Sequence, residues 1–391
     1  MTGEDFRQSG SAGSRGDLAR ALHASSARLV IAVTGGGSLA ISDLLTTPGA
    51  SRTLLEAVVP YSAAALADWL GAAPEQCASE ATARAMAAAG MRRARQLDPA
   101  AAQPVGIGCT ASLASDRPKR GAHRAFVAFQ TVDRTVAASL ELVKDRRSRA
   151  EEERLVANLI LCATADAARI AQRVPLELRD DERVTERRIN APLAWQDLML
   201  GRKRRMPAEE GSAPQEPRVI FPGAFNPLHD GHRRMAETAE SFYGEPVAFE
   251  LSIENVDKPP LDYLEIEQRA AQFRGAAEGN ELWMTAAPTF VEKVELFPKA
   301  NFLVGIDTIR RIADERYYGS AAAAEAAFDR LAAAGCQFLV FGRAAAGGFE
   351  TLSDVVLPPK LAKLCKGLPA NFFREDISST ELRRANQPPD E

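Results

Sequence analysis

The stretch GRKRRMPAEEGSAPQEPR, residues 201 to 218, constrains the fold most, because it cannot belong to a packed core. A basic run is followed there by Pro, Gly, Ser and acidic residues, a composition typical of an exposed linker. The chain has 391 residues, whereas single hydrophobic cores usually stop growing at about 250 to 300 residues. The sequence therefore predicts two domains joined by a linker over residues 201–217.

Short apolar runs alternate with amphipathic segments on both sides of this linker. Upstream, RLVIAV (28–33) indicates a strand, and three glycines and a helical pattern follow. Downstream, RVIFPG (218–223) indicates a strand and HRRMAETAESFY (232–243) a helix, and the alternation continues. This pattern is typical of α/β folds, in which helices pack on a mostly parallel sheet. We expect an α/β domain over residues 25–200 and a doubly wound, Rossmann-like α/β domain over residues 218–391.

Composition narrows the classes of function. The chain is 46% hydrophobic and 26% charged, which suits a globular protein. Its formal net charge of −4, with Lys and Arg scattered along the chain, argues against partners such as nucleic acid or a membrane surface, because those need a basic face. No apolar run reaches the length of about 18 residues that a membrane span requires. A small anionic ligand needs only a few local cations, so binding of such a ligand is not excluded by the net charge.

The first residues of the chain and its cysteines indicate where in the cell the protein is located. Residues 1–24 are polar and rich in Gly and Ser, so we expect a disordered leader and no signal peptide. The five cysteines are odd in number, widely spaced and outside any CxxC or zinc pattern. They suit reduced, mostly packed thiols, and we expect a cytoplasmic protein.

Two of the four histidines, His229 and His232, stand three residues apart behind a Gly/Pro-rich turn. In a parallel sheet this turn would lie where the first strand of the second domain ends and its helix begins, which is where ligands bind. Gly223 lets the backbone approach a ligand. A helix start near His229 would direct both imidazoles toward free N–H groups that already favour an anion. The pattern predicts a phosphate clamp, although surface histidines or a half-built metal site would show the same spacing.

Four segments of the second domain carry a family resemblance. GAFNPLHDGH (223–232) resembles the HxGH signature of the nucleotidylyltransferase superfamily, and DISSTELRR (376–384) resembles its second signature, the ISSTxxR loop. FLVGIDTI (302–309) is similar to the GxD segment of nicotinate or nicotinamide mononucleotide adenylyltransferases, and FLVFGR (338–343) to the strand that follows it. The segments occur in family order over residues 219–384.

The resemblance implies adenylyl transfer, in which a mononucleotide oxygen attacks the α-phosphorus of ATP and pyrophosphate leaves. It implies that His229 and His232 contact the triphosphate, that Arg383 holds the β- or γ-phosphate through its planar guanidinium, and that Mg²⁺ bridges the phosphates. The other residues that it assigns to nucleotide binding are Gly223, Ala224 and Phe225 in the turn, Lys258 in a loop, Asp307 on the adenosine side, and Ser378, Ser379 and Thr380 as donors. Lys258 and Arg343 fit solvated surface side chains equally well.

The acceptor is less closely specified. Mononucleotide adenylyltransferases usually carry an aromatic residue after GxD that stacks on the pyridine ring, and GIDTIRRIADERYYG has no Trp there. Tyr317, Tyr318 and Phe290 are the candidate rings, and each also fits plain packing. Nicotinamide or nicotinate mononucleotide is the favoured acceptor. Phosphopantetheine, choline phosphate and glycerol phosphate, which other branches of the superfamily use, stay open.

The N-terminal half resembles the CinA-type nicotinamide mononucleotide deamidase domain, over residues 25–175. The matching positions within AVTGGGSLAISDLLTTPGASRTLLEAVVPYS (32–62) are Thr34, Gly35, Gly36, Pro48, Gly49, Tyr61 and Ser62. Ala32 stands where the family has a serine and Leu66 where it has a lysine, so the nucleophile and its activating group are missing. Ser38 fits an ordinary first-turn serine. We expect a degenerate domain that binds a ligand, mediates oligomerisation or acts as a scaffold.

Three functions are consistent with these features of the sequence. The intact histidine pair and the intact Ser/Arg loop favour an adenylyltransferase that acts on small-molecule nucleotides, and we expect it to form a homo-oligomer. A bifunctional enzyme whose N-terminal domain still deamidates stays open, and ammonia release would reveal it. A nucleotide sensor or assembly protein without turnover is the third.

Overall fold

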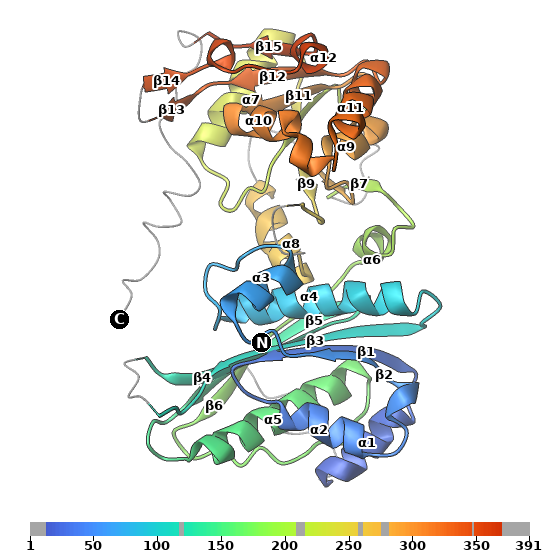
Figure 1. Ribbon diagram of the computed structural model, residues 1–391, viewed down its shortest axis with the longest axis vertical. Coiled ribbons are helices and arrows are strands. Elements are labelled where there is room, and N and C mark those ends of the chain that lie inside the picture. The colour runs from blue at the N-terminus through green and yellow to red at the C-terminus, as the bar shows by residue number, and fades with distance from the viewer. Residues whose placement is uncertain are drawn as a thin grey trace. The chain divides into compact units, whose positions relative to one another are not determined.

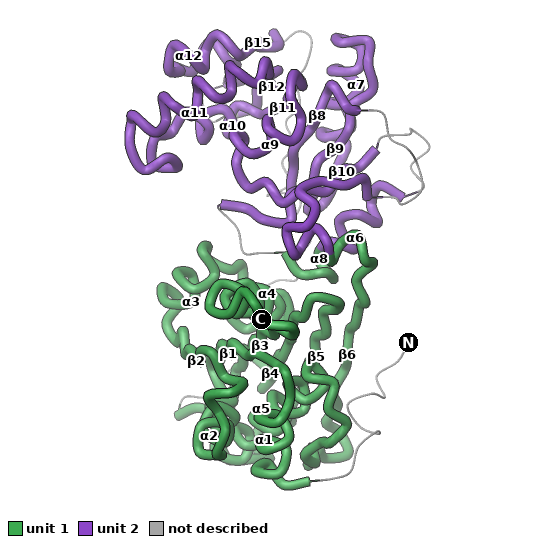
Figure 2. The backbone as a smooth tube through the Cα atoms, turned by 90° about the vertical axis from the view of Figure 1, so that its right-hand side faces the viewer, with its two compact units in different colours: residues 1–196, 257–265, 391 green, residues 197–256, 266–390 purple. Residues whose placement is uncertain are grey.

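A computed structural model of the chain describes residues 13–116, 121–208, 216–256, 261–274, 281–345 and 348–369 (Figure 1). The chain divides into two compact units (Figure 2). Unit 1 comprises residues 1–196, 257–265 and 391, and unit 2 comprises residues 197–256 and 266–390. Each unit contains its own sheet and its own helices, which confirms the predicted two-domain α/β organisation.

Unit 1 is built on a six-stranded sheet with the order β2-β1-β3-β4-β5-β6. Strand β1 pairs in parallel with β2 and β3, and the pairs from β3 to β6 are antiparallel. The strands are β1 (Ala27–Thr34), β2 (Leu54–Val58), β3 (Gln103–Ser112), β4 (His123–Gln130), β5 (Arg134–Leu142) and β6 (Arg183–Asn190). The sheet is therefore mixed, with a parallel part at the end that carries the glycine-rich turn.

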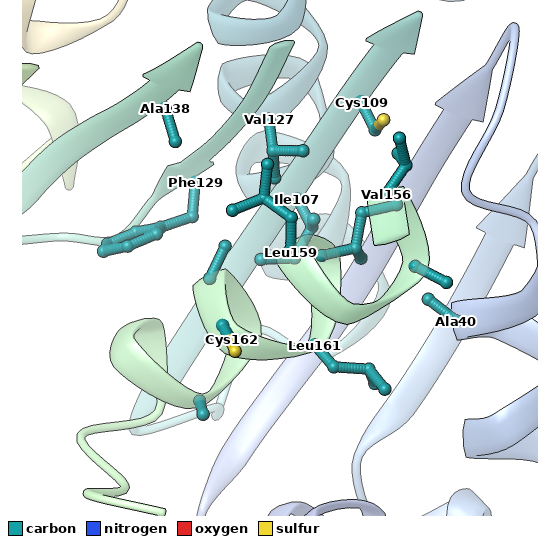
Figure 3. Packing of buried hydrophobic residues seen from close by; sticks show 14 of the residues in the cluster. Ala40, Ile107, Cys109, Val127, Phe129, Ala138, Val156, Leu159, Leu161 and Cys162 are labelled. Atoms are coloured by element: carbon teal, nitrogen blue, oxygen red, sulfur yellow. The ribbon is translucent and has the colours of Figure 1, made fainter. Parts of the chain in front are cut away.

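Helices cover both faces of this sheet, with α3 and α4 on one face and α1, α2 and α5 on the other (Figure 1). The helices are α1 (Arg15–His23), α2 (Leu39–Thr46), α3 (Ala63–Leu70), α4 (Glu80–Leu97), α5 (Arg149–Ala167) and α6 (Leu193–Met199), with a 3₁₀ turn η1 (Ala50–Arg52). Apolar residues of α5 such as Val156 and Leu159 pack against Ile107 and Val127 of the sheet (Figure 3). This close packing of branched side chains forms the main core of unit 1.

The expected disordered leader, residues 1–24, is wrong for its last part, because residues 15–23 form α1. Ser14 caps the helix by accepting a hydrogen bond from the Asp17 N–H at 3.1 Å. Leu18 and Leu22, one turn apart, are fully buried in the core of unit 1. The sequence gives two apolar residues at helical spacing, but only tertiary burial stabilises a helix this short.

Unit 2 is built on a seven-stranded sheet with the order β15-β12-β11-β8-β9-β10-β7. All neighbouring pairs are parallel except that of β7 with β10. The strands are β7 (Arg205–Pro207), β8 (Val219–Pro222), β9 (Val247–Ser252), β10 (Leu282–Thr285), β11 (Asn301–Gly305), β12 (Gln337–Phe341) and β15 (Cys365–Gly367), and β13 (Arg343–Ala345) forms a hairpin with β14 (Gly348–Glu350). The mostly parallel sheet of the second domain is as predicted.

Alternate residues of these strands face different helices, as a doubly wound sheet requires. Ile220 and Phe302 join a core with α9, α10 and α11, whereas the next residue of β8, Phe221, contacts His232 of α7. The helices are α7 (Asp230–Tyr243), α8 (Tyr263–Ala270), α9 (Phe290–Leu296), α10 (Ile306–Ala313), α11 (Ala321–Ala333) and α12 (Pro359–Ala362), with 3₁₀ turns η2 (Ala271–Phe273), η3 (Glu315–Tyr317) and η4 (Leu352–Asp354). The first three residues of α8 are assigned to unit 1. No helix within the described ranges is long and apolar enough to cross a membrane.

The predicted linker, residues 201–217, is also corrected in part, because residues 205–207 form β7. Met206 pairs opposite Met284 of β10 and is buried. A three-residue edge strand inside a charged stretch leaves almost no periodic pattern, so the sequence did not reveal it. The sequence likewise contained no sign that residues 261–265 belong to unit 1, where Asp262 accepts a hydrogen bond from Arg84 at 2.6 Å.

Candidate active site

Two helices of unit 2 start at the carboxyl ends of adjacent parallel strands. Strand β8 lies between β9 and β11. The chain passes from β8 through residues 223–229 into α7, and from Gly305 of β11 directly into α10. The chain then continues to opposite sides of β8, so the strand order reverses there. Ligands of open α/β sheets bind at such a switch point.

The two histidines meet at the first turn of α7, as predicted. His229 is the N-cap residue, and its N–H lies 3.3 Å from His232 Nδ1, to which it donates. The two rings are stacked, with their centroids 3.8 Å apart and their planes at 28°. Because Nδ1 of His232 accepts this hydrogen bond, the proton of the neutral ring sits on Nε2. That N–H is the group His232 can offer to an anion.

His232 is held in its neutral form. Burial is the main cause and the neighbouring His229 the second, and together they lower the pKa of His232 to about 3. The edges of two phenylalanine rings enclose it, with centroid distances of 5.8 Å to Phe221 and 5.2 Å to Phe225. His232 is therefore a neutral hydrogen-bond donor at a helix N-terminus, not an imidazolium cation.

This pKa predicts how stability depends on pH. Histidine in the unfolded chain titrates near the ordinary value of 6.5, so below that pH the unfolded state binds more protons than the folded state. The contribution of His232 to the free energy of unfolding is complete above pH 6.5 and is lost as the pH falls toward 3. Urea unfolding at pH 7 and pH 5 checks this: the wild type should lose more stability than His232→Gln. Equal losses in the two proteins would contradict it.

The turn before the helix is packed tightly. A Cβ at Gly223 would lie 2.4 Å from the Phe225 ring, so no other residue fits there, and the Gly223 N–H donates to the Glu250 carbonyl at 2.9 Å. Phe225 adopts a φ of 45°, which is uncommon outside glycine. Its side chain is buried against Phe249 and Phe273. The ring of Phe225 therefore belongs to the core of unit 2, and a role of this residue in nucleotide binding stays a prediction.

Asp307 lies on the first turn of α10, at the end of the strand next to β8. Its carboxylate is paired with the guanidinium of Arg343, and both side chains are about half exposed. From the sequence alone, the Arg343 side chain could contact either a nucleotide or only solvent. The ion pair places it beside the residue predicted to face adenosine, on the same edge of the sheet.

The candidate stacking rings differ in their surroundings. Phe290 packs against Phe302 and Phe338 in the core. The Tyr318 hydroxyl donates to the Ile312 carbonyl at 2.8 Å, and burial raises the pKa of Tyr318. These two rings serve packing. Tyr317 is half-buried, as are the other two, and the Arg316 guanidinium lies 4.9 Å from its ring centroid.

The remaining predicted residues of this site lie outside the described residues: Lys258, Ser378, Ser379, Thr380 and Arg383. Within the described residues the structure brings Gly223, Ala224, His229 and His232 into one loop and helix turn, with Asp307 at the end of the adjacent strand.

Sequence reasoning missed a buried charge cluster beneath the turn. Glu250 of β9 is fully buried and accepts hydrogen bonds from Lys293 Nζ at 2.7 and 2.8 Å and from the Thr285 hydroxyl. The only sign in the sequence is one glutamate inside an apolar strand, VAFELS. The pairing compensates a charge that would otherwise be very costly to bury.

Unit 1 contains a pocket of about 200 Å³. It is lined by Thr34, Gly35, Tyr61, Ser62, Ala63, Leu66, Cys77, Ala78, Thr110 and Ala111. Five of these residues were singled out in the sequence as matching or departing from the deamidase pattern, and Thr110 lies in CTASLASDRP (109–118), a further segment that departs from it. Cys77 was not singled out as part of this site, because it stands in no motif. None of the lining residues is charged. Ala32 is fully buried and does not line the pocket.

Ser38 has a structural role. Its hydroxyl donates to Glu153 Oε1 at 2.8 Å, and the N–H groups of Gly37 and Leu39 donate to the same carboxylate at 2.8 and 3.2 Å. Burial would raise the pKa of Glu153, but these hydrogen bonds outweigh it and hold the pKa below the ordinary value. The start of α2 is thus occupied by a carboxylate of the protein's own helix α5.

We expect Glu153→Ala to lower the free energy of unfolding by about 1 to 3 kcal/mol, because it leaves three donors without their acceptor. Thermal unfolding of the full chain measures this loss. Arg154→Ala, an exposed neighbour on α5, is the matched control and should change stability little. A Glu153→Ala protein as stable as the control would show that solvent satisfies these donors equally well.

Comparisons with known proteins find similarity over part of the chain. Residues 220–385 match the family model described as cytidylyltransferase-like, and this range includes the Ser/Arg loop at 376–384. No curated protein matches the chain.

Among solved structures, a competence or damage-inducible protein from Enterobacter asburiae is 18% identical, with 40% of this chain and 98% of that chain covered and a TM-score of 0.33. The competence/damage inducible protein CihA from Agrobacterium tumefaciens is 20% identical, with 41% and 94% covered and a TM-score of 0.28. Similarity at this level does not bear on activity. The family-model match agrees with the resemblance noted in the sequence of the second domain. The C-terminal part of this chain, residues 220–385, is thus similar to the cytidylyltransferase-like family.

Proposed function

We propose that this chain is a nucleotidylyltransferase that transfers AMP from ATP to a mononucleotide and releases pyrophosphate. Nicotinamide or nicotinate mononucleotide is the favoured acceptor. The observation that carries the proposal is the stacked pair His229 and His232 at the N-terminus of α7, at the end of β8. It lies in the region that matches the cytidylyltransferase-like family.

The arrangement of this pair suits stabilisation of a phosphate undergoing displacement. The His229 N–H occupies Nδ1 of His232, which leaves the Nε2–H of His232 as a donor of fixed direction. The free N–H groups at the start of α7 favour the same negative charge. Such a transfer needs no covalent enzyme intermediate, because positioning and charge neutralisation suffice.

The other groups of the proposed site act on the ends of the nucleotide. Arg383 would hold the β- or γ-phosphate, Ser378, Ser379 and Thr380 would donate to it, and Asp307 would face the adenosine. Among the described residues no group of three or more His, Cys, Asp or Glu side chains is placed to hold a metal ion. By the same resemblance, Mg²⁺ would bridge the phosphates of ATP.

The test is incubation of the full chain with Mg²⁺ and ATP or CTP, and with each candidate acceptor in turn: nicotinamide mononucleotide, nicotinate mononucleotide, phosphopantetheine, choline phosphate and glycerol phosphate. We expect pyrophosphate release that requires ATP and one of the two mononucleotides. Pyrophosphate release with CTP and choline phosphate or glycerol phosphate would show that the proposed acceptor is wrong. The reaction class, nucleotidylyl transfer, would still hold. No pyrophosphate with any pair would refute the proposal.

Ammonia measured in the same reactions tests the N-terminal domain. The pocket of unit 1 is lined by Leu66 where the deamidase pattern has lysine, and no charged group lines it. We propose that this domain does not deamidate, because a hydroxyl nucleophile needs a base to activate it. Ammonia release from nicotinamide mononucleotide would instead show a bifunctional enzyme.

A further inference from the structure

The loop that carries the two histidines is held in place by one glutamine. The Leu228 N–H donates to Gln272 Oε1 at 2.8 Å, and Gln272 Nε2 donates to the Phe225 carbonyl at 2.9 Å. A single side-chain amide therefore spans the turn on both sides of Pro227. Gln272 belongs to η2, which continues α8.

Neighbouring residues reinforce this connection. Arg269, one turn earlier, donates to the Ala224 carbonyl at 3.1 Å. The ring of Phe273, next to Gln272, packs edge-on against the Phe225 ring, with centroids 5.4 Å apart. Three backbone groups of the loop, the carbonyls of Ala224 and Phe225 and the N–H of Leu228, are thus hydrogen-bonded to one short segment.

This loop adopts a conformation that it would not maintain by itself. Phe225 has a φ of 45°, in a region that bulky residues seldom populate. His229 follows Leu228 directly and caps α7, and its N–H sets the orientation of the His232 ring. A shift of the Leu228 peptide would therefore move both imidazoles.

We propose that Gln272 is a positioning residue for the histidine clamp: it fixes the turn between β8 and α7 so that His229 and His232 present their donors in one geometry. It does not touch the phosphates. Its effect on turnover rests on the proposed function, whereas its effect on the loop can be measured without any turnover.

The test uses Gln272→Met in the full chain, because methionine keeps the length and shape of the side chain but not its two polar ends. Gln268→Met is the matched control, since Gln268 is exposed one turn earlier on α8. Hydrogen–deuterium exchange of the peptide containing Leu228 should be faster in Gln272→Met than in the wild type and unchanged in Gln268→Met. With Mg²⁺, ATP and the acceptor, kcat should fall about tenfold in Gln272→Met, because misplacement of a catalytic group by 1 Å can cost about 100-fold.

The KM for ATP of Gln272→Met should stay within about threefold of the wild-type value, since the substitution disturbs the transition state more than ground-state binding. Gln272→Glu, which keeps the acceptor toward Leu228 alone, should give slower exchange than Gln272→Met, and it decides the question if the methionine variant fails to fold. Unchanged exchange in both variants would overturn the proposal. A wild type that shows the protected loop but releases no pyrophosphate would refute the proposed function and leave the role of Gln272 in the loop intact.

Discussion

We expect His232→Ala to lower kcat for pyrophosphate release by about 100- to 1000-fold, the loss that follows when one preorganised donor to a developing charge is removed. The variant removes the Nε2–H donor, the acceptor of the His229 backbone N–H, and the ring on which the His229 imidazole stacks. ATP should still bind, though more weakly, because the helix N-terminus remains. Steady-state kinetics with Mg²⁺, ATP and the acceptor measure this, with ATP binding followed by calorimetry.

Glu237→Ala is the matched control for this substitution, because Glu237 is exposed on the same helix. It should leave kcat unchanged. Wild-type turnover in His232→Ala would end the assignment of the clamp, and with it the proposed reaction. Loss of turnover in Glu237→Ala as well would indicate that α7 as a whole, not the histidine, had been disturbed.

Arg383→Ala should lower kcat/KM for ATP by about 100-fold, which corresponds to the loss of a charge-assisted, bidentate hydrogen bond to a phosphate. This expectation comes from the resemblance of DISSTELRR to the ISSTxxR loop, and the family match extends over that segment. Arg383→Lys should restore little, because an ammonium cannot reproduce the planar pair of donors.

The adjacent Arg384→Ala offers a control with the same change in charge and nearly the same place in the sequence. It should retain most of the activity. If both variants lost activity equally, a general electrostatic attraction would explain the effect, and a specific phosphate contact by Arg383 would be wrong. If Arg383→Ala kept wild-type kinetics, the second signature would have no role in catalysis.

The general features of both units followed from the sequence because they depend on local and repetitive signals. Apolar runs such as RLVIAV and RVIFPG became β1 and β8, and the helix after HDGH begins where the spacing of the two histidines indicated. Each of these rests on hydrophobic periodicity or helix capping within a few residues. The same reasoning missed α1 and β7, whose short segments carry too few apolar residues to stand out from a polar stretch.

The properties of the candidate site also fall into those that the sequence determined and those that only the tertiary structure decided. The sequence by itself determined that two imidazoles stand at a strand-to-helix turn and that the deamidase-like half lacks its serine and its lysine. Only the tertiary structure decided that His232 is neutral, that the Phe225 ring is core, that Glu153 occupies the start of α2, and that Gln272 ties the histidine loop. These properties come from residues far apart in the chain, since burial and hydrogen bonding depend on which segments pack together and not on their order in the sequence.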